Sequence, residues 1–316
     1  MRRSEDRRLH AIEWPTVTIY ILHWCAYFAV CLQYEAHPVV AMGGLAVILG
    51  FHSSLLHEII HDHPFSSKPL NTFLGLWPMD LWLPFRDYRA THLKHHVGRH
   101  LTDPDVDPES RYFSPAQYQA LSPLGRFWLS LQMTLLGRVL IRSWTIVLSH
   151  WWDYLVRIVR GDRRMLGVWI EHALYAAPLL WFLVHVAHIP LGVYFWGAMV
   201  PANALILLRS FAEHRALEAV PHRTAIVEHA TLLGPLYLYN NLHSLHHADP
   251  TLPWYHYKAQ FQARREQLLA DNGGLVYRDY WQIWRQYAFK AHDAIIDPLH
   301  RIRETPPAPL HSPPPS

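Results

Sequence analysis

The sequence predicts an all-α integral membrane protein with two transmembrane helical hairpins, about four transmembrane helices in all, and a cytoplasmic helical cap that carries the histidine clusters. Three observations lead to this fold class. Long apolar runs occur in two pairs, and each pair is joined by a short turn. Lys and Arg are absent from both turns and frequent elsewhere, as the positive-inside rule requires. The 25 histidines nearly match the 28 Lys and Arg residues, and many gather near the ends of the apolar runs.

The first apolar pair covers residues 16–34 and 39–56, with residues 35–37 as the turn. Each run is near the length that an α-helix needs to cross the ~30 Å hydrocarbon core of a bilayer. The second helix returns the chain to its starting side and there delivers His57 and His61. A buried hairpin in a soluble bundle is the alternative, but the near absence of charge through both runs favours the membrane.

The N-terminal segment, residues 1–15, is predicted to be cytoplasmic, because arginines precede a long apolar run that has no obvious signal-peptide cleavage site. The turns at residues 35–37 and 187–190 then lie on the opposite side, and every histidine cluster lies on the cytoplasmic face of what we expect to be a bacterial inner membrane. The net charge of +3, without a continuous basic stripe, argues against nucleic acid as a partner. Cys25 and Cys31 lie in one apolar run and offer no disulfide framework.

The segment between the hairpins is expected to lie at the membrane surface. Residues 70–85 are apolar but interrupted by proline, which favours an interfacial or re-entrant segment. Residues 86–96 predict a helix that carries a histidine cluster. Residues 127–152 hold Arg138 and Arg142 among long apolar stretches, so we predict a helix that lies along the membrane surface.

The second apolar pair covers residues 168–186 and 191–208, joined by a short link at residues 187–190. It repeats the first hairpin, and its returning helix again leads to a histidine, His214. Both returning helices therefore deliver histidine to the same side of the membrane.

The C-terminal part of the chain is expected to cover the histidine clusters. Residues 254–271 and 277–296 are predicted to be helices of the cytoplasmic cap. The membrane catalytic domain then spans residues 16–300, and the Pro-rich residues 301–316 are predicted to be a disordered tail.

The histidine pattern is the strongest functional signal. His243, His246 and His247 have i, i+3, i+4 spacing, so on a helix their imidazoles share one face and can converge on a metal. The same HxxHH spacing occurs in residues 92–96, and an HxxxH pair occupies residues 57–61. Two irons need roughly eight to ten ligands if each is five- or six-coordinate. A single zinc ion takes three or four protein ligands and would leave most of these histidines unused.

The clusters HxxxH, HxxHH and HxxHH, in this order and together with two hydrophobic hairpins, resemble the three histidine boxes of the membrane fatty acid desaturase and hydroxylase superfamily. The resemblance covers roughly residues 15–260 and implies a non-haem di-iron centre. The ligands it implies are His57, His61, His92, His95, His96, His243, His246 and His247, with His214 as the extra histidine after the fourth helix. Ser210 stands where some desaturases have Asn, and Asn240 and Asn241 are the nearest substitutes.

The resemblance implies an oxidoreductase of lipid metabolism, with two Fe ions as cofactor and O2 as co-substrate, that attacks an unactivated C–H bond. Desaturation of a fatty acid or acyl lipid is the favoured reaction, because the YNNLHxxHH setting of the third box resembles bacterial desaturases. Hydroxylation of an alkyl or carotenoid substrate on the same scaffold is the alternative. No fused cytochrome or flavin motif is visible, so a separate ferredoxin or cytochrome donor is expected. No catalytic residue separate from the metal ligands is predicted.

Polar residues near the boxes are candidates to orient the ligand imidazoles by accepting their free ring N–H groups. These candidates are Glu58, Asp103, Asp107, Glu213, Asn240 and Asn241. The acidic segment at residues 103–109 is one source of them, and a solvated, Pro-punctuated turn is the alternative interpretation of this segment.

Other classes of function fit the sequence less well. His57 to His61 also forms an HExxH motif, which suggests a zinc intramembrane metalloprotease with Glu58 as general base, but this leaves both HxxHH clusters unexplained. A metal transporter or store would need ionisable residues within its spans, and these runs hold few. Four isolated histidines are expected to have structural roles: His23, His52, His172 and His185.

Overall fold

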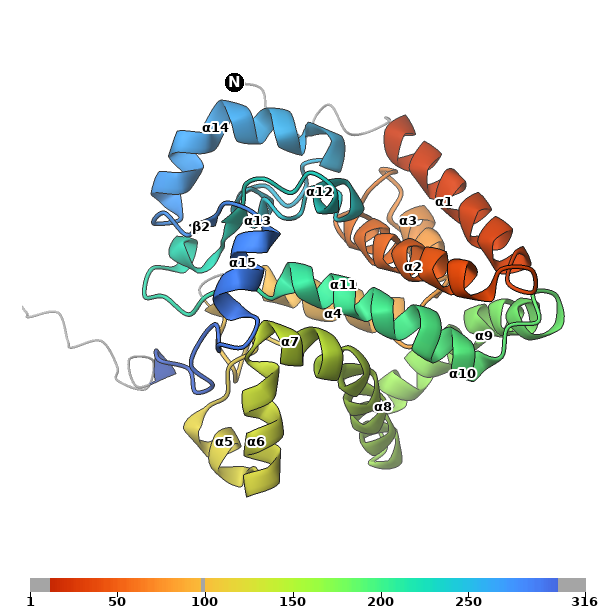
Figure 1. Cartoon of the computed structure of the whole chain (residues 1–316), viewed down its shortest axis with the longest axis horizontal. Coiled ribbons are helices and arrows are strands. Elements are labelled where there is room, and N and C mark those ends of the chain that lie inside the picture. The colour runs from red at the N-terminus through yellow and green to blue at the C-terminus, as the bar shows by residue number, and fades with distance from the viewer. Residues whose placement is uncertain (1–11, 98–99, 301–316) are drawn as a thin grey trace, which may run out of the picture.

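The computed structural model describes residues 12–97 and 100–300, so the arginine-rich start of the chain and the Pro-rich residues 301–316 lie outside the described residues. The fold is mostly helical, at 65% helix, which confirms the predicted class (Figure 1). Strands β1 (Ile226–Val227) and β2 (Val276–Tyr277) form a short parallel pair in which Ile226 is aligned with Val276.

The first hairpin consists of α1 (Trp14–Leu32) and α2 (Pro38–Ile60). Each helix has proline in its first turn, where the missing N–H has no intrahelical partner to lose. Helix α2 continues beyond the predicted apolar run, because its last turns pack inside the protein and every residue from 54 to 60 is buried. His57 therefore lies within the helix, and His61 forms its C-cap.

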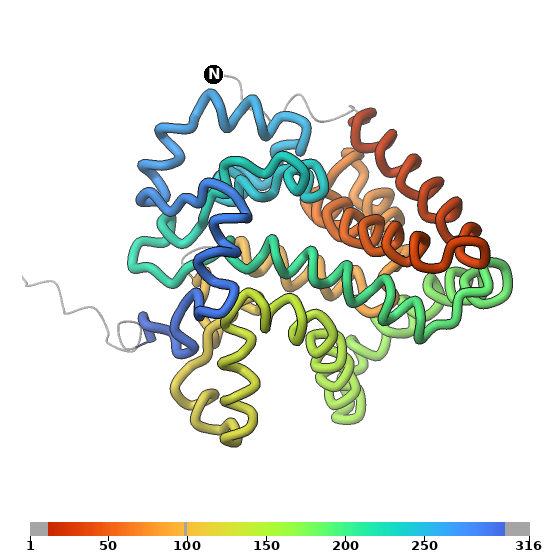
Figure 2. The backbone as a smooth tube through the Cα atoms, in the orientation of Figure 1, coloured from red at the N-terminus to blue at the C-terminus, as the bar shows by residue number. Residues whose placement is uncertain are grey.

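The second hairpin contains a continuous but irregular returning helix. The outgoing helix is α9 (Arg163–His185). The returning helix is built from α10 (Leu191–Tyr194), a π-helical turn (Phe195–Met199) and α11 (Val200–Ser210). The returning helix packs along α2, and the two run side by side in Figure 2. Gly197 allows this approach, since a Cβ at this position would lie 3.0 Å from Cγ of Met42.

Four helices are long and apolar enough to cross a membrane, or up to five if a bent helix pair is counted as one span. The four are Trp14–Leu32, Pro38–Ile60, Arg163–His185 and Leu191–Ser210. They coincide with the four predicted runs and fit an integral membrane protein. The first is as long as predicted but begins two residues earlier, and the other three are a few residues longer.

The segment at residues 127–152 is not one helix, so this prediction is wrong. It comprises α6 (Pro123–Gln132), α7 (Leu135–Gly137), a π-helical turn (Arg138–Arg142) and α8 (Ser143–Val159). The direction changes by 103° after α6. Thr134 begins the new helix, because its Oγ1 accepts the N–H of Gly137 (3.1 Å). A Cβ on Gly137 would overlap the carbonyl oxygen of Leu131, so the bend requires glycine there.

The first part of the connection between the hairpins contains three short helices. Part of the predicted interfacial segment forms α3 (Lys68–Gly75), and the chain is then largely irregular up to Pro84. Helix α4 (Phe85–His95) follows this proline and carries the second histidine cluster. Helix α5 (Pro115–Ala120) starts at a capping box between Ser114 and Gln117.

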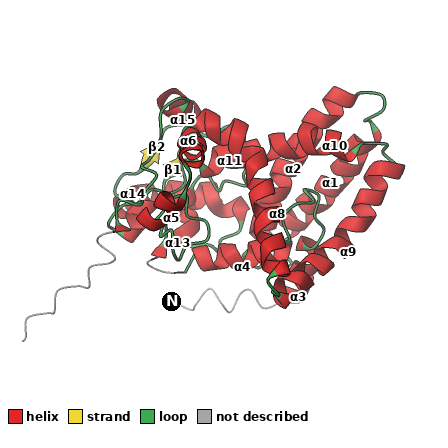
Figure 3. Cartoon of the chain, turned by 90° about the horizontal axis from the view of Figure 1, so that it is seen from below, coloured by secondary structure: helices red, strands yellow, loops and turns green. Residues whose placement is uncertain are grey.

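The cap comprises α12 (Leu233–Leu236), α13 (His243–Ala248), α14 (Tyr257–Asp271) and α15 (Tyr280–Tyr287). Figure 3 shows the strands and α13 to α15 at one side of the molecule, with α1, α9 and α10 at the other. The single helix predicted over residues 277–296 is wrong, because the helix ends at Tyr287. The chain then turns inward, where Ile296 forms a parallel bridge with Phe113.

Candidate metal centre

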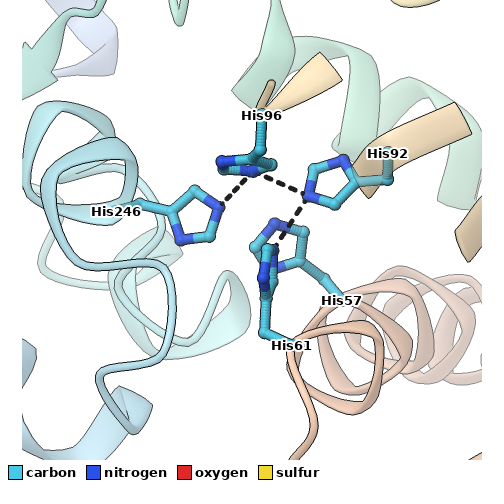
Figure 4. A group of neighbouring side chains, drawn as sticks. All are labelled: His57, His61, His92, His96 and His246. Atoms are coloured by element: carbon cyan, nitrogen blue, oxygen red, sulfur yellow. Dashed lines mark hydrogen bonds between the residues drawn. The ribbon is translucent and has the colours of Figure 1, made fainter. Parts of the chain in front are cut away.

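The nine histidines predicted as ligands converge in two adjacent groups. One group, drawn in Figure 4, contains His57, His61, His92, His96 and His246, and the other contains His95, His214, His243 and His247. In each group, one nitrogen from every ring lies within 4.8 Å of all the others. Opposite ligands of an ion with bonds of about 2.1 Å are separated by about 4.2 Å, so each group has the dimensions of one coordination sphere.

Helix geometry divides each HxxHH cluster between the two groups. His92 lies in α4 and His96 is the C-cap of this helix; the two belong to the same group, whereas His95 belongs to the other. Consecutive helical residues point about 100° apart, so His95 and His96 face different groups. Helix α13 shows the same division, because His246 belongs to the first group while His243 and His247 belong to the second.

The outward ring nitrogens of the second group are held by oxygen acceptors. Nδ1–H of His95 donates to Oδ1 of Asp107 (2.9 Å), and Nδ1–H of His243 donates to Oδ1 of Asn240 (3.1 Å). Nδ1–H of His214 donates to the carbonyl oxygen of Arg223 (3.3 Å). A neutral imidazole has only one N–H, so these bonds leave the lone pair on Nε2, which is the atom a metal needs.

The inward nitrogens of this group test whether a metal fits. Nε2 of His214 lies 3.0 Å from Nε2 of His95 and 2.9 Å from Nε2 of His243. Because the single N–H of each ring is used at Nδ1, both contacts place one lone pair against another. A cation between the rings would remove this repulsion and satisfy all three nitrogens. The residues present therefore fit a metal ion.

The first group follows the same pattern. Nδ1–H of His92 donates to Oε1 of Glu109 (2.9 Å), while Nδ1 of His246 lies 2.9 Å from the hydroxyl of Tyr257. Nε2 of His92 lies 3.1 Å from Nε2 of His96. Nε2 of His57 is buried and has no hydrogen-bond partner, which makes it a further free donor to a metal.

The electrostatic surroundings keep most of these imidazoles neutral. Burial, reinforced by neighbouring imidazoles, lowers the pKa well below its usual range in four rings: His214, His243, His246 and His247. Burial also lowers the pKa of His96 to about 3. Burial alone would lower the pKa of His95 too, but Asp107 and Glu109 raise it above the usual value. Neutral imidazole is the form that binds metal, so the site is prepared for an ion near neutral pH.

Three of the six candidate orienting residues lie next to ligand rings. Asp107 and Asn240 accept ring N–H groups as described. Glu213 pairs with Arg209 (2.9 Å) and lies 3.6 Å from Nδ1 of His243. The amide of Asn240 thus holds a ligand ring from outside.

The other three candidates make contacts elsewhere. Oε2 of Glu58 accepts the backbone N–H of Trp254 (3.2 Å), so this carboxylate ties α2 to the cap. Asp103 accepts the backbone N–H of Asp105 within its own loop (3.0 Å). The side chain of Asn241 donates to the carbonyl oxygen of Val227 in β1 (2.8 Å), the strand that pairs with β2.

Sequence reasoning did not single out Glu109, Tyr257 or the Arg223 carbonyl, although all three lie against ligand rings. Glu109 ends the acidic loop, and its position in a Pro-rich acidic segment beside an HxxHH box was the one available signal. Arg111 was also missed. It donates to the carbonyl oxygens of Phe211 and His214 and thereby braces the ligand-bearing turn after α11.

A cavity of about 310 Å³ adjoins the second group. Its lining includes His214, Glu213 and Glu109. Further lining residues come from α2, α4, α11, the π-helical turn Arg138–Arg142 and α8. The cavity therefore gives a bound molecule access to the candidate metal centre.

Four candidate spans that lead to two adjacent all-imidazole groups define a membrane protein with a histidine-rich centre capable of binding metal. Comparison with protein families identifies the family. The family model described as "Fatty acid desaturase" matches residues 32–281, and the chain belongs to this family. The predicted superfamily is thereby confirmed, and the family implies an oxidoreductase that is associated with the membrane and acts on lipid. No curated protein and no solved structure matches the chain in the comparisons made.

Proposed function

We propose that the protein is an O2-dependent di-iron oxidoreductase and that its reaction is desaturation of a fatty acid or acyl lipid. The observation that carries this proposal is the convergence of five and four imidazoles on two adjacent positions. A centre with only nitrogen ligands in two neighbouring spheres suits a pair of transition-metal ions better than one zinc ion, which takes three or four protein ligands.

The proposed ligands are the nine histidines of the two groups. A pair of iron ions held there would supply the redox chemistry that couples O2 to C–H cleavage. Overall, CH2–CH2, O2, two electrons and two protons give CH=CH and two molecules of water. The electrons come from a separate carrier, a ferredoxin or a cytochrome.

Side chains of the protein would orient the imidazoles and bind the substrate. Asp107, Glu109 and Asn240 hold ring N–H groups on the outer side and so present unprotonated Nε2 atoms inward. The adjoining cavity admits the substrate beside His214. Its wall includes apolar side chains such as Leu207, which suit an alkyl chain.

The orientation in the membrane is part of the proposal. With the N-terminus in the cytoplasm, two hairpins return the chain to the same side, where the histidine groups and the cap would meet a soluble electron donor. The location proposed is the bacterial inner membrane. The domain limits proposed are residues 16–300 for the catalytic domain, flanked by a basic segment and a Pro-rich tail.

The decisive experiment combines metal analysis with product analysis. Detergent-purified protein should contain two irons per chain, and Mössbauer spectra of iron-57-enriched protein should show a coupled pair. With a reduced donor and O2, the lipid product should be two hydrogens lighter than the substrate. A product heavier by one oxygen atom would instead identify a hydroxylase. One zinc and no iron would refute the di-iron proposal and support the alternative hypothesis, a zinc intramembrane metalloprotease that uses the HExxH motif.

Single substitutions supply the controls. His95→Ala, His246→Ala and His247→Ala should each abolish turnover and lower bound iron. His185→Ala is the matched control, because this histidine is exposed at the far end of α9. Full activity in all three ligand variants would contradict the proposed site.

A further inference from the structure

The cavity beside the second histidine group is lined by four arginines, Arg111, Arg138, Arg142 and Arg209. Two of these are neutralised within the protein. Arg111 pairs with Asp293, and Arg209 pairs with Glu213. These two guanidinium groups therefore need no further anion.

The other two arginines have no anionic partner. Within residues 12–97 and 100–300, the side chains of Arg138 and Arg142 form no ion pair and no hydrogen bond, and Nε of Arg138 is buried without an acceptor. Both lie on the π-helical turn that follows the bend at Gly137. An unpaired charge in a half-buried position is costly unless a partner arrives from outside the protein.

The acidic groups around the cavity do not supply this partner. Asp87 accepts the hydroxyl proton of Tyr154 (2.7 Å). Asp107 holds His95, Glu109 holds His92, and Glu213 is paired as described above. Burial raises the pKa of Asp80 to about 7, which reduces its negative charge near neutral pH. No carboxylate that lines the cavity therefore pairs with Arg138 or Arg142, and the positive charge of this part of the wall is unpaired among the described residues.

The remaining wall is suited to hydrocarbon. Trp82, Leu83 and Ile146 line the same cavity as the arginines and His214. A molecule with an anionic group and an alkyl portion could place the anion on the guanidinium groups and its chain along this wall. The planar fork of arginine matches the geometry of both carboxylate and phosphate.

We propose that Arg138 and Arg142 bind the anionic group, carboxylate or phosphate, of an amphiphilic alkyl substrate whose chain extends toward His214. This inference rests on the proposed function, because it specifies the substrate class of the same site. It makes the two arginines specificity-determining residues. A neutral hydrocarbon or a neutral ester is correspondingly a poor ligand.

The test measures binding to full-length, iron-loaded protein in detergent. Radiolabelled decanoate, decyl phosphate and decan-1-ol are compared by equilibrium dialysis. At least one of the two anions should bind about tenfold or more tightly than the alcohol, since charge-assisted hydrogen bonds are lost with the alcohol. The tighter anion identifies the group. Equal affinity for all three probes, or binding of neither anion, would overturn the proposal.

Variants separate charge recognition from packing. Arg138→Gln and Arg142→Gln should reduce anion affinity to that of decan-1-ol, while alcohol binding stays the same. Arg160→Gln, an exposed arginine that follows α8, is the matched control and should bind all probes as the wild type does. Equal weakening of alcohol and anion binding would assign the arginines a packing role and refute recognition.

A second pair of variants guards against misfolding. Arg138→Lys and Arg142→Lys retain the charge and should keep part of the anion preference, and the iron content of each variant reports whether the centre is intact. Because binding is measured without turnover, loss of the anion preference in an active enzyme would refute this inference alone. An iron-free wild type would refute the proposed function instead.

Discussion

The hydroxyl of Tyr257 lies 2.9 Å from Nδ1 of His246, and both side chains are buried. Tyr257 belongs to α14, whereas His246 belongs to α13, so this contact fixes the cap helix against a ligand of the first group. Tyr257→Phe removes one oxygen and leaves the packing of the ring in place. Removing a group that hydrogen-bonds a metal-bound imidazole typically weakens metal binding by about 10- to 100-fold, so we expect Tyr257→Phe to lose one iron to a chelator faster than the wild type does. Tyr118→Phe on α5 is the control, and equal iron retention in the two variants would show that the hydroxyl does not position His246.

The two carboxylates of the acidic loop should affect different metal positions. Asp107 holds His95 of the second group, whereas Glu109 holds His92 of the first group. Asp107→Ala leaves a buried Nδ1–H without an acceptor, which costs about 1–3 kcal/mol, and should preferentially deplete one iron. Asp107→Asn should be milder, because the amide oxygen can still accept. Mössbauer spectra of the Asp107 and Glu109 variants should therefore lose different components, and identical spectra would contradict this assignment.

Neighbouring histidines of one box should likewise deplete different ions. His95 and His96 are adjacent in sequence but belong to different groups. We expect His95→Ala and His96→Ala each to bind roughly half the iron of the wild type, with distinct spectra for the ion that remains. Loss of both irons with the same residual spectrum in both variants would argue that the boxes are not divided.

The bend before the arginine-bearing turn should depend on Gly137. A Cβ there would overlap the carbonyl oxygen of Leu131, and overpacking typically costs about 1–3 kcal/mol. Gly137→Ala should lower the thermal midpoint of the purified protein and weaken ligand binding in the cavity. Gly43→Ala is the matched control, because a Cβ at that position meets nothing within 4 Å. Equal midpoints for the two variants would mean that the bend tolerates a side chain.

The ion pair between Asp293 and Arg111 should make the free energy of unfolding depend on pH in the acidic range. Burial alone would raise the pKa of Asp293, but His292, Arg111 and Arg215 lower it to about 2, from an ordinary value of 3.8. The stabilisation is therefore present above about pH 4 and is lost as the pH falls toward 2. Asp293→Asn should destabilise the protein by about 3 kcal/mol at pH 7. Its difference from the wild type in thermal midpoint should shrink below pH 4, and a difference independent of pH would exclude this ionic role.

Much of the fold was predictable because hydrocarbon thickness, helix length and charge constrain the same residues. The four apolar runs of the sequence became four candidate spans. The break at residues 133–134 was not predictable, since apolar composition continues through it. Its causes are local, namely the Thr134 cap and the close approach at Gly137.

The histidine groups were foreseen as a set because spacing on a helix determines which imidazoles share a face. The partition of each box was not foreseen, because it depends on the angles at which α2, α4 and α13 meet. Partners such as Tyr257 lie on other elements, and only tertiary structure brings them to the ligand rings. The HExxH motif shows that a sequence pattern can also suggest a role that the structure does not favour. The motif suggested Glu58 as a general base, but the side chain of Glu58 accepts the backbone N–H of Trp254 in the cap.

Because both HxxHH boxes are divided between the two candidate metal positions, binding of an ion at one position should affect binding at the other. Helices α4 and α13 each contribute to both coordination spheres, so the first ion to bind already orients the rings that await the second. Loading should therefore be cooperative, with few half-filled molecules at intermediate iron concentrations. The same linkage means that chelation of one ion weakens the binding of the other, so a variant that has lost one ion should release the remaining ion more readily than the wild type does.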